Sequence, residues 1–198
     1  MAYRRTPAVE ARLTASRERI LAAALALVAQ EGYAGCSVAA VARHGQVATG
    51  SVYRHFPNKA SLVTEVFRTA CQREIAAVAE AAGSPGRASE RIAAMVETFC
   101  ERALREPVLA YALLAEPVDI AVDAERLRFR RAFSGVFAQV IAEGMLFEEL
   151  PEQDAEVTAA ALVGAIAEAL VAPLQSGRAA PDTVPSLTSF TLRAIGTY

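Results

Sequence analysis

The chain has 198 residues, of which 54% are hydrophobic and 21% are charged. It therefore holds enough apolar material for a core in one or two domains, and it is not a disordered tail. Only 9 prolines and 11 glycines occur, and recurrent alanine-rich stretches favour an all-α protein. Cys36, Cys71 and Cys100 are scattered and form no Cys-x-x-Cys pair, which argues against a disulfide framework and against a structural zinc site.

Charge is distributed unevenly along the chain. The net charge is −2, but residues 1–60 carry eight Lys and Arg residues against three Glu residues, a net charge of +5, so the remainder carries −7. A basic segment joined to an acidic body is typical of a phosphate-binding domain attached to a second domain with another task.

Targeting and membrane segments are not expected. The first residues contain no apolar signal-peptide core, and no uninterrupted apolar run approaches the about 18 residues that a membrane span needs. We expect a cytoplasmic protein with no membrane partner.

Hydrophobic periodicity and capping residues predict a succession of helices. Gly32 is expected to end the first helix, Ser37 to cap the second and Gly45 to end it, and the Gly83 to Gly86 stretch to act as a linker. The helices are expected over residues 17–30, 38–44, 48–55 and 59–82, around Ile92 to Phe99 with an end at Pro107, over 108–115, around Phe129 to Val140 with an end near Gly144, and over 154–172 and 186–195.

The second and third of these helices have the dimensions of a helix-turn-helix. They read Ser37-Val-Ala-Ala-Val-Ala-Arg-His and Ala48-Thr-Gly-Ser-Val-Tyr-Arg-His, with a glycine-containing turn between them. Small or branched apolar residues allow the two helices to pack closely, which leaves the outer face of the second helix free to enter a DNA major groove. Hydroxyl groups and a guanidinium on that face suit base edges and phosphates. The face holds Thr49, Gly50, Ser51, Tyr53, Arg54 and His55.

This segment resembles the TetR (tetracycline-repressor) family of transcriptional regulators over roughly residues 14–70. The family pattern is matched in register at ten positions, which are Val47, Gly50, Ser51, Val52, Tyr53, His55, Phe56, Asn58, Lys59 and Leu62. Two positions depart from it. Gln46 stands where glycine is commoner, and Ala48-Thr49 replaces a frequent Ser-Lys pair.

The resemblance implies roles for individual residues in DNA binding. Ser37 and Tyr53 are expected to contact phosphates, and Lys59 to bind the backbone beside the N-terminal amides of the following helix. Thr49 and Ser51 are expected to meet bases. Arg54, or an N-terminal arm carrying Arg4, Arg5 and Arg12, is expected to compensate for the missing lysine, and such an arm could reach a minor groove.

Purely structural explanations compete with these DNA-binding roles. Tyr53 could be a core aromatic, Phe56 is taken as structural, and Ser37 caps its helix with or without DNA. Two histidines, His44 and His55, without clustered carboxylates or cysteines do not make a metal or acid-base site. We expect no metal and no cofactor.

The second part of the chain is expected to bind an effector. Aromatic and sulfur-containing residues on the predicted helices would, by the resemblance, line a pocket, although plain helical core is the competing interpretation for each. No charged cluster is evident on these apolar faces, which favours an apolar or aromatic small molecule. The expected pocket residues are Phe67, Cys71, Met95, Phe99, Tyr111, Phe129, Phe133 and Phe137.

The alanine-rich helix over residues 154–172 has faces smooth enough for close helix-helix contact. By the resemblance, this helix and the last one form a four-helix bundle across a two-fold axis. Ordinary packing within one chain is the alternative. The expected homodimer interface comprises Val157, Ala161, Gly164, Ala165, Glu168 and Phe190.

Together these observations predict an all-α protein with a three-helix helix-turn-helix DNA-binding domain at residues 1–60 and a helical effector-binding and dimerisation domain at residues 61–198. The expected function is that of a regulator, usually a repressor in this family, which a small molecule releases from a palindromic operator. The alternative is a helical ligand-binding protein or an enzyme with an incidental helix-turn-helix. Neither a Gly-x-Ser-x-Gly nucleophile elbow nor a phosphate loop is present to favour an enzyme.

Overall fold

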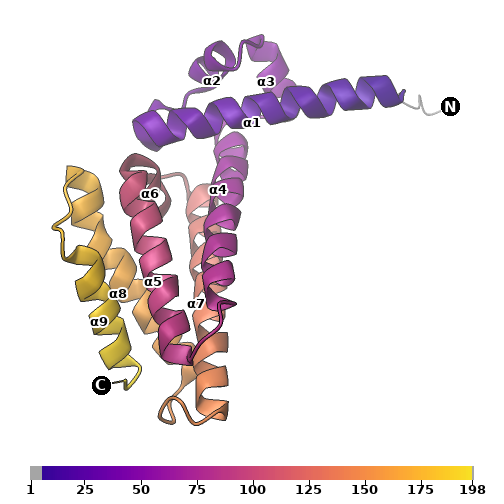
Figure 1. The fold of residues 1–198 in the computed structure, drawn as a ribbon. Helices are drawn as coiled ribbons and strands as arrows, with labels where there is room; N and C mark the ends of the chain where they lie inside the picture. The colour runs from indigo at the N-terminus through magenta and orange to yellow at the C-terminus, as the bar shows by residue number, and fades with distance from the viewer. Residues whose placement is uncertain (1–5, 198) are drawn as a thin grey trace.

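The computed structural model describes residues 6–197, and over that range the chain forms nine helices and no strand (Figure 1). The predicted all-α fold class is confirmed. The expected arm residues Arg4 and Arg5 lie outside the described residues. The helices are α1 (Pro7–Gly35), α2 (Val38–His44), α3 (Thr49–His55), α4 (Lys59–Ala82), α5 (Ala88–Arg105), α6 (Pro107–Leu114), α7 (Ile120–Leu146), α8 (Ala155–Ser176) and α9 (Thr183–Ala194).

Helix α1 lies across the end of the bundle, above the start of α4, with α2 and α3 on its far side (Figure 1). It begins ten residues before the predicted start, because Pro7 occupies its first turn and Glu10 favours a helix N-terminus. Residues 6–12 are all exposed, so these turns carry no buried stripe that a sequence pattern could reveal. At Gly32 the backbone turns out of the helix at φ +71°, a conformation that glycine readily adopts.

Helices α2 and α3 form as predicted. The Ser37 hydroxyl accepts a hydrogen bond of 3.1 Å from the Ala40 amide and so caps α2. Val41 and Val52 are fully buried and hold α2 and α3 against α1. In the turn between them, Gln46 has φ +51°. The position where glycine was expected from the resemblance therefore does adopt a backbone conformation that disfavours a side chain.

Helix α4 runs between the two parts of the protein as one continuous helix with the predicted bounds. Its N-terminus is closed by a capping box, in which the Asn58 side chain accepts from the Ser61 amide at 2.8 Å and the Ser61 hydroxyl reaches the Asn58 amide. Leu62 and Val66, on its early turns, are buried. The expected domain boundary at residues 60 and 61 falls in the first turn of this helix.

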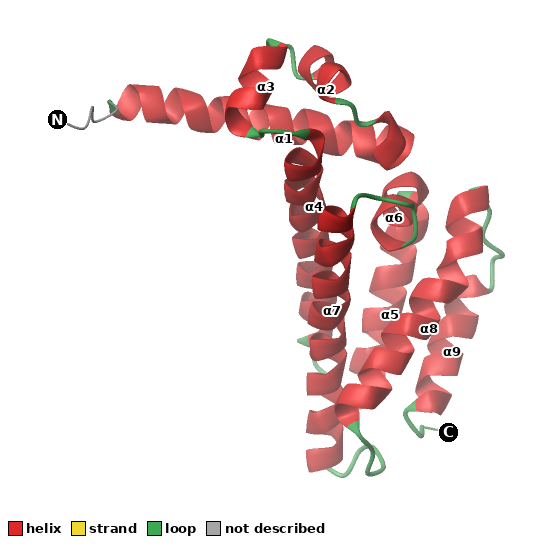
Figure 2. Ribbon diagram, turned by 180° about the vertical axis from the view of Figure 1, so that it is seen from behind, coloured by secondary structure: helices red, strands yellow, loops and turns green. Residues whose placement is uncertain are grey.

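Helices α5 and α7 pack against the remainder of α4, and α8 and α9 lie on the side of the bundle away from α4 (Figure 2). Helix α7 packs along α4 and α8, and α9 packs along α5. Pro107 follows the end of α5 and also occupies the first turn of α6, where its missing amide hydrogen costs nothing. Pro185 likewise falls in the first turns of α9, which begins three residues earlier than predicted.

Helix α8 has a mean hydropathy of 1.9 over 18 residues, and 33% of that window is buried. It is long and apolar enough, by length and composition alone, to cross a membrane. A search for uninterrupted apolar runs misses the membrane-span length of α8, because Glu168 divides its apolar stretch in two. Leu162, Ile166 and Leu170 face the core and are buried, so α8 is a core helix on one side and presents a second, uncovered face.

Candidate nucleic-acid interface and effector cavity

Helix α3 presents the predicted polar face to solvent. Thr49, Gly50, Tyr53 and Arg54 are exposed, and 52% of Tyr53 is accessible. Tyr53 is therefore not a core aromatic, whereas Phe56, at 4% exposure, is. Apart from its chain neighbours and the backbone of its own helix, no atom of residues 6–197 lies within 4 Å of a Cβ built on Gly50, so packing against other elements does not require glycine there.

The other predicted DNA-binding residues are partly buried or already make contacts within the protein. Ser51 and His55 are half-buried, and Ser37 is exposed but uses its hydroxyl to cap α2. Lys59 is half-buried: its Nζ donates to the Tyr33 carbonyl at 3.0 Å and lies 4.0 Å from the centre of the Tyr33 ring. In this structure the ammonium ties the start of α4 to the end of α1.

A groove runs between the N-terminal half of α1 and the end of α3. Its walls are Val9, Leu13, Thr14, Arg17, Arg54 and His55. Burial, together with the nearby Arg17 and Arg54 charges, lowers the pKa of His55. The groove thus places two guanidinium groups beside a neutral imidazole next to the exposed face of α3, an arrangement suited to an anion.

The end of α1 is joined to the loop between α6 and α7 by polar contacts. The Glu116 carboxylate accepts from the Tyr33 amide at 2.8 Å and from the Ala34 amide at 3.2 Å, and the Tyr33 hydroxyl donates to Asp119. Burial, reinforced by Asp119, raises the pKa of Tyr33 to about 12. Arg126 of α7 binds the Glu116 carbonyl at 2.7 Å and the Leu113 carbonyl at 3.0 Å, so this junction also touches α6.

Two small cavities lie inside the helical bundle, of about 60 Å³ and about 20 Å³. Phe99, Leu114 and Phe129 border both. The second is also lined by Phe133 and Phe137, and edge-to-face contacts join Phe133 to Phe99 and to Phe129 at 5.2 and 4.7 Å between ring centres. A drug-sized ligand needs roughly 300 Å³ or more, so neither cavity is large enough for such a ligand in this conformation.

The predicted pocket residues divide into two groups. Phe99, Phe129, Phe133 and Phe137 line the cavities, whereas the others do not border them. Three of those others, Phe67, Cys71 and Met95, are buried core residues, and Tyr111 is partly buried on α6.

Charged residues also border the first cavity, which the sequence did not indicate. Arg102 pairs with Glu74 of α4 at 2.7 Å, and Arg105 and Glu106 complete a polar rim. The periodicity of α5 places Arg102 three residues from Phe99, but its partner on α4 is 28 residues away. Only the folded arrangement brings the pair together.

The predicted dimer residues lie on the uncovered side of α8 and on α9. Val157 is 65% exposed, Phe190 is 41% exposed, and Ala161, Gly164 and Glu168 are exposed. Ala165 is half-buried. A Cβ built on Gly164 would meet no atom of the described residues within 4 Å. These residues therefore contribute little to the core of a single chain.

Some polar residues at the site were not singled out by the sequence. They are Arg17, Glu65, Arg68, Glu116, Glu125 and Arg126. The three-residue spacing of Glu65 and Arg68 and of Glu125 and Arg128 is a local signal for ion pairs on a helix. Contacts between helices, such as Arg17 with Glu65, leave no such signal. Within residues 6–197 no group of three or more His, Cys, Asp or Glu side chains is placed to hold a metal ion.

Comparison with known proteins agrees with this geometry. The family model of bacterial regulatory proteins, tetR family, matches residues 20–66, which run from α1 into α4. The HTH-type transcriptional repressor KstR of Mycolicibacterium smegmatis is 30% identical over 130 residues, or 65% of this chain and 64% of the relative. KstR of Mycobacterium tuberculosis is 28% identical over 65% of this chain and 59% of the relative. The chain thus spans less than two thirds of the length of the curated relatives it matches.

Solved structures share most of the fold. The transcriptional regulator FadR from Bacillus subtilis, in complex with stearoyl-CoA, has a TM-score of 0.77 at 19% identity and covers 91% of this chain and 98% of its own. The reduced form of NemR from E. coli has a TM-score of 0.75 at 17% identity, with 92% and 98% coverage. The similarity therefore extends well beyond the helix-turn-helix.

Proposed function

The chain belongs to the tetR family of bacterial regulatory proteins, and we propose that it is a DNA-binding transcriptional regulator, a repressor, which leaves its operator when a small molecule binds. The observation that carries the proposal is the exposed polar face of α3, with Thr49, Tyr53 and Arg54 on it, beside a groove that holds Arg17 and His55. The KstR relatives, which match 65% of this chain, are transcriptional repressors.

The bound DNA is proposed to be a palindrome read by a homodimer. One seven-residue recognition helix reaches only a few base pairs, so two copies related by symmetry are needed for a specific site. The uncovered apolar face of α8, with Phe190 of α9, is the proposed interface. Dimer formation would also cover the exposed apolar face of α8, which agrees with a cytoplasmic protein.

The effector is proposed to be an apolar or aromatic small molecule held between α5, α6, α7 and α8. The aromatic lining of the two cavities supports this assignment. The FadR structure contains stearoyl-CoA, which combines a long apolar chain with an anionic head, and Arg102 and Arg105 at the rim would suit such a head. Because the cavities are small, the ligand must displace α6 or its neighbours, and α6 is tied to α1 through Glu116.

The three cysteines are not placed to serve as catalytic nucleophiles. Cys36, Cys71 and Cys100 are buried, and burial raises the pKa values of their thiols to about 11, 12 and 12. A thiol with so high a pKa is a poor nucleophile at neutral pH.

The decisive experiment measures binding of the purified protein to DNA from upstream of its own gene over a series of salt concentrations. A specific site is expected, with affinity that falls steeply as salt rises because phosphate contacts release counterions. Tyr53→Ala should weaken binding to every sequence, whereas Thr49→Ala should change the preference among operator variants. Absent or salt-insensitive binding would overturn the proposal.

A second experiment tests the effector class. Stearoyl-CoA, free coenzyme A and stearate are each added to the protein and to the protein–operator complex. A ligand of the proposed class raises the melting temperature of the free protein and dissociates the complex, since both effects follow from binding to one conformation. Phe133→Ala should lower the affinity for the ligand without changing DNA affinity in its absence.

A further inference from the structure

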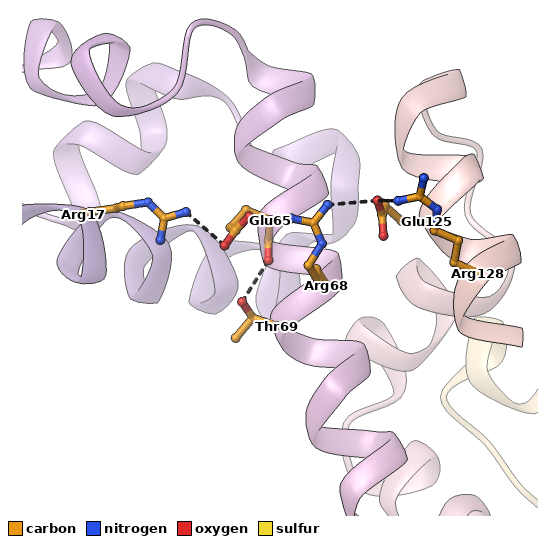
Figure 3. A network of polar contacts seen from close by, with 6 residues as sticks. All are labelled: Arg17, Glu65, Arg68, Thr69, Glu125 and Arg128. Carbon is orange, nitrogen blue, oxygen red and sulfur yellow. Dashed lines mark hydrogen bonds and ion pairs between the residues drawn. The ribbon is translucent and has the colours of Figure 1, made fainter. Parts of the chain in front are cut away.

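A chain of ion pairs crosses the protein from α7 to α1 (Figure 3). Glu125 of α7 accepts from both Arg128 and Arg68, each at 2.9 Å. Arg68 of α4 also binds one carboxylate oxygen of Glu65 at 2.9 Å, and the other oxygen of Glu65 binds Arg17 of α1 at 2.9 Å. Every link joins opposite charges, so the position of each side chain depends on the next.

Glu65 is the centre of this chain of contacts. Its two carboxylate oxygens hold two different arginines, and its backbone carbonyl accepts from the Thr69 hydroxyl at 2.9 Å (Figure 3). Its side chain is 26% exposed and that of Glu125 is 14% exposed, so neither is fully screened by solvent. Arg17 and Arg68 therefore share one negative charge.

Arg17 stands at that end of the ion-pair series which faces the helix-turn-helix. Its guanidinium lies 5.3 Å from the centre of the Phe56 ring, which follows α3, and its side chain lines the groove that also holds Arg54 and His55. With 41% of the Arg17 side chain exposed, a ligand in the groove can reach the guanidinium. The same cation thus borders both an internal carboxylate and an open site for an anion.

We propose that this groove binds one phosphate of the DNA backbone through Arg17, Arg54 and His55, and that Glu65 competes with the phosphate for Arg17. The proposal rests on the proposed function, because it assigns an additional DNA contact to the same protein. Arg17 becomes a DNA-binding residue, and Glu65 becomes a positioning residue that acts through it.

Glu125 adjusts this competition from the effector-binding part of the chain. While Glu125 supplies Arg68 with a second carboxylate, Glu65 is shared between Arg68 and Arg17. When Glu125 loses its charge, Arg68 has Glu65 as its remaining partner in this network and draws it from Arg17. The guanidinium of Arg17 is then more available to a phosphate.

The test is a mutant cycle on the full-length protein bound to its operator, with melting temperatures measured to show that each variant folds. Arg17→Gln should lower DNA affinity and reduce the slope of log affinity against log salt by about 0.9, the value for one lost phosphate contact. Arg17→Lys should retain most of that slope, because it keeps the charge. Glu65→Gln should raise DNA affinity about two- to fivefold, the range that one exposed ion pair supplies. Glu125→Gln should act in the same direction by a smaller factor.

The control and the double variants separate this proposal from general electrostatics. Glu80→Gln removes an exposed charge from the same helix and should leave DNA affinity unchanged within the error of the measurement. In the Arg17→Gln background, Glu65→Gln and Glu125→Gln should have no effect. An equal gain from Glu65→Gln with and without Arg17, or an unaltered salt slope in Arg17→Gln, would overturn the proposal. Wild-type protein that binds no operator at all would instead refute the proposed function.

Discussion

The Glu116 carboxylate accepts a 2.8 Å hydrogen bond from the backbone amide of Tyr33, a residue 83 positions earlier in the chain. The backbone leaves the helix at Gly32, so the amides that follow lose their usual carbonyl partners four residues back. Glu116 supplies the replacement for Tyr33 and Ala34. The loop between α6 and α7 thus completes the end of α1, which joins the candidate DNA-binding surface to the wall of the cavities.

Gly32→Ala is expected to destabilise the protein by about 1–3 kcal/mol. A Cβ at this position would lie 2.9 Å from a carboxylate oxygen of Glu116, and φ is +71°, so both the contact and the backbone oppose a side chain. Urea unfolding measures the change in the free energy of unfolding.

The control for this change is Gly135→Ala on α7, where a Cβ meets no atom of the described residues within 4 Å. Alanine in place of a helix glycine should stabilise there by about 0.5–1 kcal/mol. A gain in stability at Gly32 similar to that at Gly135 would contradict the account of the junction.

Gln46→Gly is expected to stabilise the protein by about 0.5–1 kcal/mol, because φ at Gln46 is +51° and the residue is exposed. Thermal unfolding in the absence of ligands provides the measurement. Ser84→Gly, in a loop at a residue without positive φ, should be neutral or destabilising, since there glycine only adds freedom to the unfolded chain. Matching effects of the two changes would show that the turn is not strained.

Local features of the sequence predicted the helix-turn-helix well. Ser37 as a cap, the bounds of α4 and the exposure of Tyr53 follow from interactions that span a few residues. The early start of α1 was missed because its first turns bury nothing. Periodicity also placed Phe99, Phe129, Phe133 and Phe137 on the inner faces of their helices.

Long-range relationships could not be read from the sequence in the same way. Phe67 and Phe129 have the same apolar character, yet only Phe129 borders a cavity, because that depends on how the helices leave space between them. The sequence also presents Lys59 as a phosphate contact, but the fold brings the Tyr33 carbonyl to 3.0 Å from its ammonium. Glu116 and Arg17 find their partners on other helices, and residue spacing says nothing about such pairs.

The affinity for DNA is expected to rise as the pH falls from about 7.5 to about 6. Burial and the charges of Arg17 and Arg54 lower the pKa of His55 in the unbound protein, and a phosphate in the groove would raise it again. The complex therefore binds more protons than the free protein does, and by linkage a lower pH favours the complex. Fluorescence anisotropy with an operator fragment at constant ionic strength measures the effect. His55→Gln should flatten the pH dependence, whereas His44→Gln should leave it in place; a dependence that survives in His55→Gln would rule out His55 as its source.

Gly164→Glu is expected to convert a dimer to a monomer without unfolding the chain. A Cβ added at this position points into open space, Gly164 is exposed, and glutamate is a better helix former than glycine, so the fold of one subunit should tolerate it. On a face with exposed Val157 and Ala161, however, a charge would be buried against the partner, which is costly when it is unpaired. Light scattering after size-exclusion chromatography reports the mass. Gly135→Glu, the same change at another unobstructed helix position on α7, should keep the dimer mass and operator affinity, whereas Gly164→Glu should lose most of its operator affinity because one recognition helix then acts alone. A Gly164→Glu protein that stays dimeric would place the interface on a different surface.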